Sequence, residues 1–193
     1  MAELTRIVLA GEGGQGVQTV AEILAEAANE EGRQALYIPN FGVEQRGGVS
    51  VAYVQISDSQ IGSPKFQTGD IVIALSDRAV QRTQKYVGPD TIFVYDSTIE
   101  GLEGELPKNA AEVLAIPAVE VAKREFHPRV FNIIILGAVV GASGVISLEQ
   151  AKAAVEKRLG SKFVKQPQLR DLNFRALERG ASMVKGACGR SQD

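Results

Sequence analysis

The feature that most constrains this chain is an apolar run that meets a glycine-rich turn and continues into an amphipathic stretch. Residues 6–10 read Arg-Ile-Val-Leu-Ala, residues 11–16 read Gly-Glu-Gly-Gly-Gln-Gly, and apolar side chains then recur at helical spacing from Val17 to Ala28. This order predicts a strand, a tight turn and a helix. Glycines permit positive φ and let a ligand approach the backbone, while a helix N-terminus offers N–H groups to an anion. The unit therefore predicts a site for a phosphorylated ligand.

The glycine spacing fits the G-x-G-x-x-G pattern of dinucleotide-binding turns, but two details argue against NAD. Glu12 places a carboxylate inside the expected pyrophosphate cradle, and the next apolar run, residues 35–40, carries no acidic residue for a ribose. No P-loop segment occurs in the chain, so a P-loop nucleotidase is unsupported. A turn of this kind can also serve only to pack a helix against a sheet, and that interpretation stays open.

Further strands and helices alternate along the chain. Apolar or β-branched runs predict strands at 35–40, 49–56, 71–75, 91–95 and 113–116, and helices are expected at 76–86, from 118, at 130–140, from 147 to Gly160 and at 169–185. This alternation predicts an α/β fold with a doubly wound, mostly parallel sheet flanked by helices, Rossmann-like with additional insertions. We expect one domain over residues 1–193, with a frayed tail at 186–193.

Composition excludes several classes of function. The chain has 193 residues, 45% of them hydrophobic, a formal net charge of −2, one His and one Cys. A chain with this net charge lacks the basic surface that nucleic-acid binding needs. With one His and one Cys, it cannot supply the usual ligands of an iron–sulfur or structural zinc site. The longest apolar stretch, 130–140, is too short to span a bilayer, and the N-terminus lacks a secretory pattern, so we expect a cytoplasmic protein without membrane insertion. His127 is expected to be a surface or capping residue, and Cys188 an incidental one.

A second unusual loop follows residues 35–40. It reads Asn-Phe-Gly-Val-Glu-Gln-Arg-Gly-Gly over residues 40–48, and Arg46 beside Gly47 could bring a guanidinium to an anion, or could be a solvated arginine at a turn. Parallel sheets bind ligands beyond the carboxyl ends of their strands, so this loop and the first glycine turn are expected at one edge. Asn132 lies inside an apolar run and must hydrogen-bond to something if buried, either within the protein or to a ligand. Asp96, in an Asp-Ser turn pair, is left out of the site.

No nucleophile, paired carboxylates or metal cluster is recognisable, which favours a binding subunit over a self-sufficient enzyme. The pair of motifs G-x-G-G-Q-G at 11–16 and G-x-x-x-R-G-G at 42–48, with Asn132 preceding Leu-Gly-Ala at 136–138, resembles the gamma subunit or gamma domain of the 2-oxoacid:acceptor oxidoreductases. The similarity covers residues 5–185. The variant Gln-Arg of the second motif is similar to indolepyruvate-type members, although the substrate could also be pyruvate, 2-oxoglutarate or phenylglyoxylate.

The resemblance implies a subunit of a complex that oxidatively decarboxylates a 2-oxoacid with coenzyme A (CoA), giving acyl-CoA and CO2 and reducing ferredoxin or NAD. It implies thiamine diphosphate with Mg and [4Fe-4S] clusters on partner chains, namely alpha- and beta-type thiamine-binding subunits and a ferredoxin-like subunit. This chain would contribute assembly contacts and part of the CoA site, with no catalytic or metal residue of its own. The expected contact residues are Gly11, Gly13, Gly14, Gln15, Gly16, Arg46, Gly47 and Asn132.

Two other interpretations remain. The glycine turn could bind a dinucleotide in a stand-alone oxidoreductase or sensor, in which case the isolated chain would bind NAD(P) tightly and ignore CoA. Alternatively, both glycine loops could serve packing alone in a purely architectural subunit. Replacing Arg46 would then leave the KM for CoA unchanged.

Overall fold

A six-stranded sheet forms the centre of the computed structural model, which describes residues 4–41 and 48–188. The strands are β1 (Leu4–Gly11), β2 (Gln34–Asn40), β3 (Ser50–Ser57), β4 (Ile71–Ala74), β5 (Ile92–Asp96) and β6 (Glu112–Ile116). They lie side by side in the order β2-β3-β1-β4-β5-β6. All four residues of β4 are buried, as a continuous apolar run in the middle of a covered sheet requires.

The strand directions confirm a mostly parallel sheet with one reversed strand in its described part. β1, β4, β5 and β6 are parallel neighbours, whereas β3 runs antiparallel to both β1 and β2. Since β3 is reversed relative to both, β2 runs in the direction of β1. In the register, Ser50 pairs with Gly11, and Val51 pairs with Asn40. The end of β2 and the start of β3 therefore lie at the sheet edge where β1 ends.

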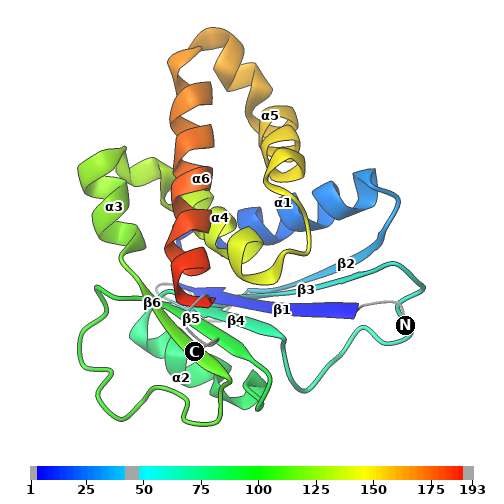
Figure 1. Ribbon diagram of the computed structural model, residues 1–193, viewed down its shortest axis with the longest axis vertical. Coiled ribbons are helices and arrows are strands. Elements are labelled where there is room, and N and C mark those ends of the chain that lie inside the picture. The colour runs from blue at the N-terminus through cyan, green and yellow to red at the C-terminus, as the bar shows by residue number, and fades with distance from the viewer. Residues whose placement is uncertain (1–3, 42–47, 189–193) are drawn as a thin grey trace.

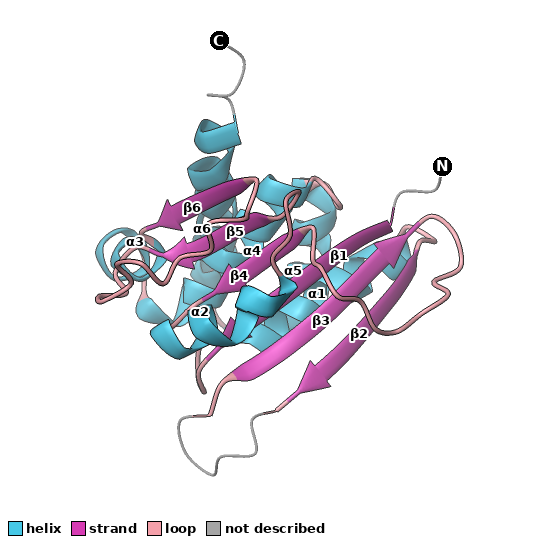
Figure 2. Ribbon diagram, turned by 90° about the horizontal axis from the view of Figure 1, so that it is seen from below, coloured by secondary structure: helices cyan, strands magenta, loops and turns pink. Residues whose placement is uncertain are grey.

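Helices cover both faces of the sheet unequally (Figure 1). They are α1 (Val17–Glu30), α2 (Asp77–Thr83), α3 (Ala118–Glu125), α4 (Phe131–Ser143), α5 (Leu148–Lys165) and α6 (Gln168–Cys188), with short 3-10 turns η1 (Gln84–Tyr86) and η2 (Pro128–Val130). α2 lies below the sheet in Figure 1, while α1, α3, α4, α5 and α6 lie above it. Figure 2 shows α2 in front of the middle strands, with β2 and β3 beside it. The doubly wound prediction holds, with most of the helical mass on one face.

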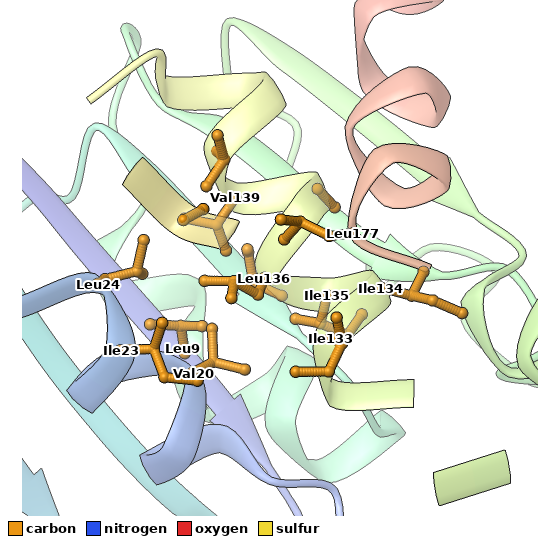
Figure 3. Close-up of a cluster of buried hydrophobic side chains, with 14 of the residues drawn as sticks. Leu9, Val20, Ile23, Leu24, Ile133, Ile134, Ile135, Leu136, Val139 and Leu177 are labelled. Atoms are coloured by element: carbon orange, nitrogen blue, oxygen red, sulfur yellow. The ribbon is translucent and has the colours of Figure 1, made fainter. Parts of the chain in front are cut away.

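The larger part of the core lies between the sheet and the helices above it. Figure 3 shows α1 and α4 meeting there over β1, with Leu9, Leu24 and Leu136 among the buried side chains. A smaller cluster on the opposite face joins α2 to the sheet through residues such as Val72, Val80 and Phe93. Every residue of α4 from 133 to 140 is buried, so this helix is surrounded by protein on all sides.

The crossing of α4 and α6 depends on three glycines. A Cβ placed on Gly137 would lie 2.0 Å from the carbonyl oxygen of Leu177, and one on Gly180 would lie 2.0 Å from that of Ile134. A Cβ on Gly141 would lie 2.7 Å from the carbonyl oxygen of Ala181. The backbones of the two helices are therefore in direct contact. The helix predicted at 130–140 is confirmed, because burial and backbone contact outweigh the strand propensity of its three consecutive isoleucines.

The structure corrects the predicted end of α5. The capping box at its start is present, since the Ser147 hydroxyl accepts a bond from the Gln150 backbone N–H at 3.1 Å and the Gln150 side chain accepts one from the Ser147 N–H. The helix continues through Gly160 to Lys165, because glycine costs a helix only about 1 kcal/mol and the next turn buries Phe163.

Residues 186–188, expected to be part of a frayed tail, belong to α6, which extends to Cys188, and residues 189–193 lie outside the described part. None of the helices among the described residues is long and apolar enough to cross a membrane.

Candidate functional site

The turn between β1 and α1 has the conformation that its glycines predict. Gly14 has φ of 93° and Gly16 has φ of 77°, both in the left-handed region that glycine adopts without strain. Gly16 is also the N-cap of α1 and supplies no side-chain bond to the helix. The first turn of α1 contains no acidic side chain. The backbone N–H groups at this helix end therefore meet neither a capping side chain nor a carboxylate from the helix itself.

The glycines of the six-residue turn are of two kinds, those packed against other residues and those exposed on the surface. A Cβ on Gly11 would lie 2.6 Å from Gln15 Oε1, and one on Gly16 would lie 2.7 Å from Asn132 Cβ. At Gly13 and Gly14, which are exposed, a Cβ would have no heavy atom of residues 4–41 and 48–188 within 4 Å. Gly11 and Gly16 are thus required by the packing of the protein. Only Gly13 and Gly14 present bare backbone to the outside.

Gln15 braces the turn with both ends of its side-chain amide. Its Oε1 accepts a hydrogen bond from the Glu12 backbone N–H at 2.7 Å, and its Nε2 donates to the Leu75 carbonyl oxygen at 2.7 Å. Leu75 directly follows β4, so the bond joins the turn after β1 to the turn after its parallel neighbour. The structure therefore gives Gln15, expected as a ligand contact, a role in holding the turn.

Asn132 is brought to the turn from a distant part of the chain. It lies in the first turn of α4, partly buried, and its Cβ faces Gly16 at a distance that leaves no room for a side chain there. Asn132 therefore lies directly beside the glycine turn. Its amide also lines a cavity between α1, α4, α5 and α6, which is considered further below.

Arg46 and Gly47 lie outside the described residues. The strand ends on either side are at the same edge as the glycine turn, because Asn40 ends β2 there and Ser50 begins β3 opposite Gly11.

A residue that the sequence reasoning missed strengthens this edge. Gln18, in the first turn of α1, donates from Nε2 to Ser50 Oγ at 2.5 Å and accepts a bond from the Tyr37 hydroxyl at 2.6 Å. It ties the helix end to both strands that flank the second loop.

Other polar groups considered from the sequence have partners within the protein. Asp96 Oδ2 accepts the Val119 N–H of α3 at 2.8 Å, and its Oδ1 accepts the Thr98 N–H at 2.9 Å. His127 Nδ1 accepts the Arg129 backbone N–H at 3.1 Å, which confirms its expected capping role. Among the residues described, no group of three or more His, Cys, Asp and Glu side chains could hold a metal ion.

On the α2 face, Tyr53 of β3 lies in an aromatic cluster near the end of β2. Its hydroxyl is 2.7 Å from that of Tyr86, and its ring meets Phe66 edge-on at 6.0 Å between centroids. Burial, and then the bond to Tyr86, raise the pKa of Tyr53 to about 12. The contact of the two hydroxyls joins β3 to the 3-10 turn η1.

Comparison with known proteins identifies relatives over nearly the whole chain. Residues 6–183 match the model of the family described as pyruvate ferredoxin/flavodoxin oxidoreductase. The ketoisovalerate oxidoreductase subunit VorA of Methanothermobacter thermautotrophicus is 34% identical over 180 residues, which are 93% of this chain and 36% of that protein. The chain thus spans about a third of the length of this curated relative.

Two solved structures share the fold. The gamma subunit of a keto/oxoacid ferredoxin oxidoreductase from Geobacter sulfurreducens is 30% identical, with a TM-score of 0.79, over 96% of this chain and 98% of that one. The 2-oxoglutarate:ferredoxin oxidoreductase from Magnetococcus marinus, solved with 2-oxoglutarate, coenzyme A and succinyl-CoA bound, has a TM-score of 0.85. It is 24% identical and aligns with 95% of this chain and 31% of its own, which establishes similarity of fold.

Proposed function

Because this chain belongs to the pyruvate ferredoxin/flavodoxin oxidoreductase family, we propose that it is the gamma-type subunit of a 2-oxoacid:acceptor oxidoreductase and provides part of its CoA site. The reaction is the oxidative decarboxylation of a 2-oxoacid with CoA to acyl-CoA and CO2. Support comes from the 30% identity to a solved gamma subunit over nearly all of both chains. The chain's own contribution is binding and positioning.

The observation that carries the CoA assignment is the open backbone at Gly13 and Gly14. Both residues are exposed at the edge where β1 ends, and no atom of the described residues occupies the space that a side chain would fill. The adjoining N-terminus of α1 has no side-chain cap, so its N–H groups and the positive end of the helix dipole are available to a phosphate. We assign a phosphate group of CoA to this turn, with Gln15 holding the turn in shape.

Arg46 and Gly47 complete the proposed site, by resemblance to the second family motif. The ends of β2 and β3 hold this loop's attachment points beside the glycine turn. An arginine can bind a phosphate through two N–H groups, which suits one of the anionic groups of CoA. Asn132 would act by packing against Gly16 rather than by direct contact with the phosphates.

The remaining chemistry is proposed to come from partner chains. Alpha- and beta-type subunits would bind thiamine diphosphate with Mg, and a ferredoxin-like subunit would carry [4Fe-4S] clusters. The 2-oxoacid and the acceptor, ferredoxin or NAD, would be selected mainly by those partners.

The test compares two glycines at which the protein itself tolerates a side chain. Gly13 and Gly62 are both exposed, have no heavy atom within 4 Å of a Cβ, and lack positive φ. In the assembled complex, Gly13→Leu should raise the KM for CoA about 10- to 150-fold, the equivalent of about 1.5–3 kcal/mol of lost charge-assisted hydrogen bonding. The KM for the 2-oxoacid should stay the same, and the control Gly62→Leu should change neither constant.

An unchanged KM for CoA in Gly13→Leu would refute the assignment of the turn to CoA. Equal increases in both KM values, with loss of partner chains on size exclusion, would instead show that the turn serves assembly. Tight binding of NAD(P) by the isolated chain, unaffected by CoA, would favour a dinucleotide site.

A further inference from the structure

A cavity of about 670 Å³ opens between the helices of the molecule, and Asn132, which packs against Gly16, is one of its lining residues. It lies between α1, η2, the start of α4, the second half of α5 and the start of α6. None of residues 11–16 lines it. Its size falls within the range of about 300–1,000 Å³ that is usual for small-molecule sites.

The floor of this cavity is apolar. Ile23 from α1, Ile133 from α4 and Phe163 from α5 are buried at its base, and the partly buried Leu169 and Leu172 of α6 complete it. These side chains come from four separate elements, so the shape of the cavity is set by the packing of the whole helical layer. A floor of this kind favours an apolar ligand body.

The rim, in contrast, is basic. Arg129, Arg158 and Lys162 line the cavity, and its described lining contains no Asp or Glu. Arg158 is neutralised by ion pairs with Glu22 and Glu26 of α1, the second with an N–O separation of 3.6 Å. The side chains of Arg129 and Lys162 form no ion pair within residues 4–41 and 48–188, so two positive charges remain available at the rim.

His127 adds a neutral donor to the same rim. Its Nδ1 accepts the backbone N–H of Arg129, so the neutral imidazole carries its proton on Nε2. An apolar floor with two uncompensated cations and an imidazole N–H at its mouth matches a molecule with an apolar body and one anionic end.

We propose that this cavity binds an amphipathic anion, whose carboxylate or phosphate meets Arg129 and Lys162 and whose hydrocarbon or aryl body lies on the floor formed by Ile133, Phe163 and Leu172. The site is separate from the proposed CoA site and extends the function of the chain beyond it. The two sites adjoin at Asn132, which packs against Gly16, and at Thr19 in the first turn of α1.

The experiment measures binding of octanoate to the full chain by amide chemical shifts in NMR, with octanol and octylamine as uncharged and cationic analogues. Octanoate should shift the amides of residues such as Ile133 and Leu172, leave those of Gly13 and Gly14 in place, and bind more tightly than octanol. Its affinity should fall as salt rises. Octyl phosphate in place of octanoate identifies the preferred anionic group within the same class of ligand.

Two lysines near the end of α5 provide a matched pair of variants. Lys162→Met removes a rim charge, whereas Lys165→Met removes the same charge three residues later, outside the lining. Lys162→Met should weaken octanoate binding at least about threefold, the scale of one partly exposed charge contact, while Lys165→Met should not. Equal affinities for octanoate and octanol, equal effects of the two variants, or shifts centred on Gly13 would each overturn the proposal.

Discussion

Replacing Gly137 with alanine should destabilise the protein more than the same substitution at a helical glycine that has open space around it. The added Cβ would lie 2.0 Å from the Leu177 carbonyl oxygen, about 1.4 Å short of the 3.4 Å at which ordinary contact begins. The oxygen belongs to the backbone of α6 and cannot rotate away, so the two helices must separate. Overpacking of this kind costs about 1–3 kcal/mol and sometimes more.

The size of the effect follows from two opposing terms. Alanine favours an isolated helix over glycine by about 1 kcal/mol, whereas separating α4 from α6 also loosens contacts along their whole crossing. We expect a net loss of about 2–3 kcal/mol, which for a chain of this size lowers Tm by about 4–12 °C. Urea unfolding followed by circular dichroism measures the free energy, and calorimetry measures Tm.

Gly160 is the matched control for this substitution. It lies inside α5, and a Cβ there would meet no heavy atom within 4 Å. Gly160→Ala should therefore raise the unfolding free energy by about 0.5–1 kcal/mol through helix propensity and a stiffer unfolded chain. If Gly137→Ala proves as stable as Gly160→Ala, the backbone contact of α4 with α6 does not exist in solution and the reasoning fails.

Three further outcomes are expected. Arg46→Ala should raise the KM for CoA about 10- to 150-fold in the assembled complex and change the KM for the 2-oxoacid less, with equal changes pointing to damaged assembly. Ionisation of Tyr53 near pH 12 should raise the absorbance at 295 nm, and this rise should be absent in Tyr53→Phe. An unfolded tyrosine ionises near pH 10, so the free energy of unfolding of the parent protein should fall between pH 10 and 12. The part of this decrease that Tyr53 causes should be absent in the variant. Ser147→Ala should cost about 1 kcal/mol in urea unfolding by removing a helix cap, while Ser161→Ala, exposed in the same helix, should cost nothing measurable.

Local features of the fold could be predicted from the sequence because short-range physics determines them. The strand, glycine turn and first helix, and the capping box of α5, each follow from a few adjacent residues. The reversal of β3 was missed although a signal existed. Only nine residues separate Asn40 from Ser50, and a parallel crossover needs about a dozen or more, so an antiparallel pair was the available connection.

The candidate site was less predictable because its residues act through distant partners. Gln15 reads as a ligand contact in the motif, but its amide is bound to the carbonyl oxygen of Leu75 on another strand turn. Gly11 and Gly13 look equivalent in sequence. The structure shows that the Cβ position of Gly11 is occupied by neighbouring side chains, whereas that of Gly13 is open in the described part of the chain. Gln18 carried no signal at all, since its partners on β2 and β3 are set by the fold of the sheet.

The glycine contact between α4 and α6 also bears on how the chain is made. During synthesis α4 emerges from the ribosome before α6. Residues 133–140 are then an apolar segment whose packing partner α6 has not yet been synthesised. During that interval the backbone around Gly137 and Gly141 is uncovered and available to chaperones or proteases. Once α6 has been synthesised, its residues Leu177, Gly180 and Ala181 cover this backbone. Quality control in the cell can therefore discriminate a chain that includes α6 from one truncated before it.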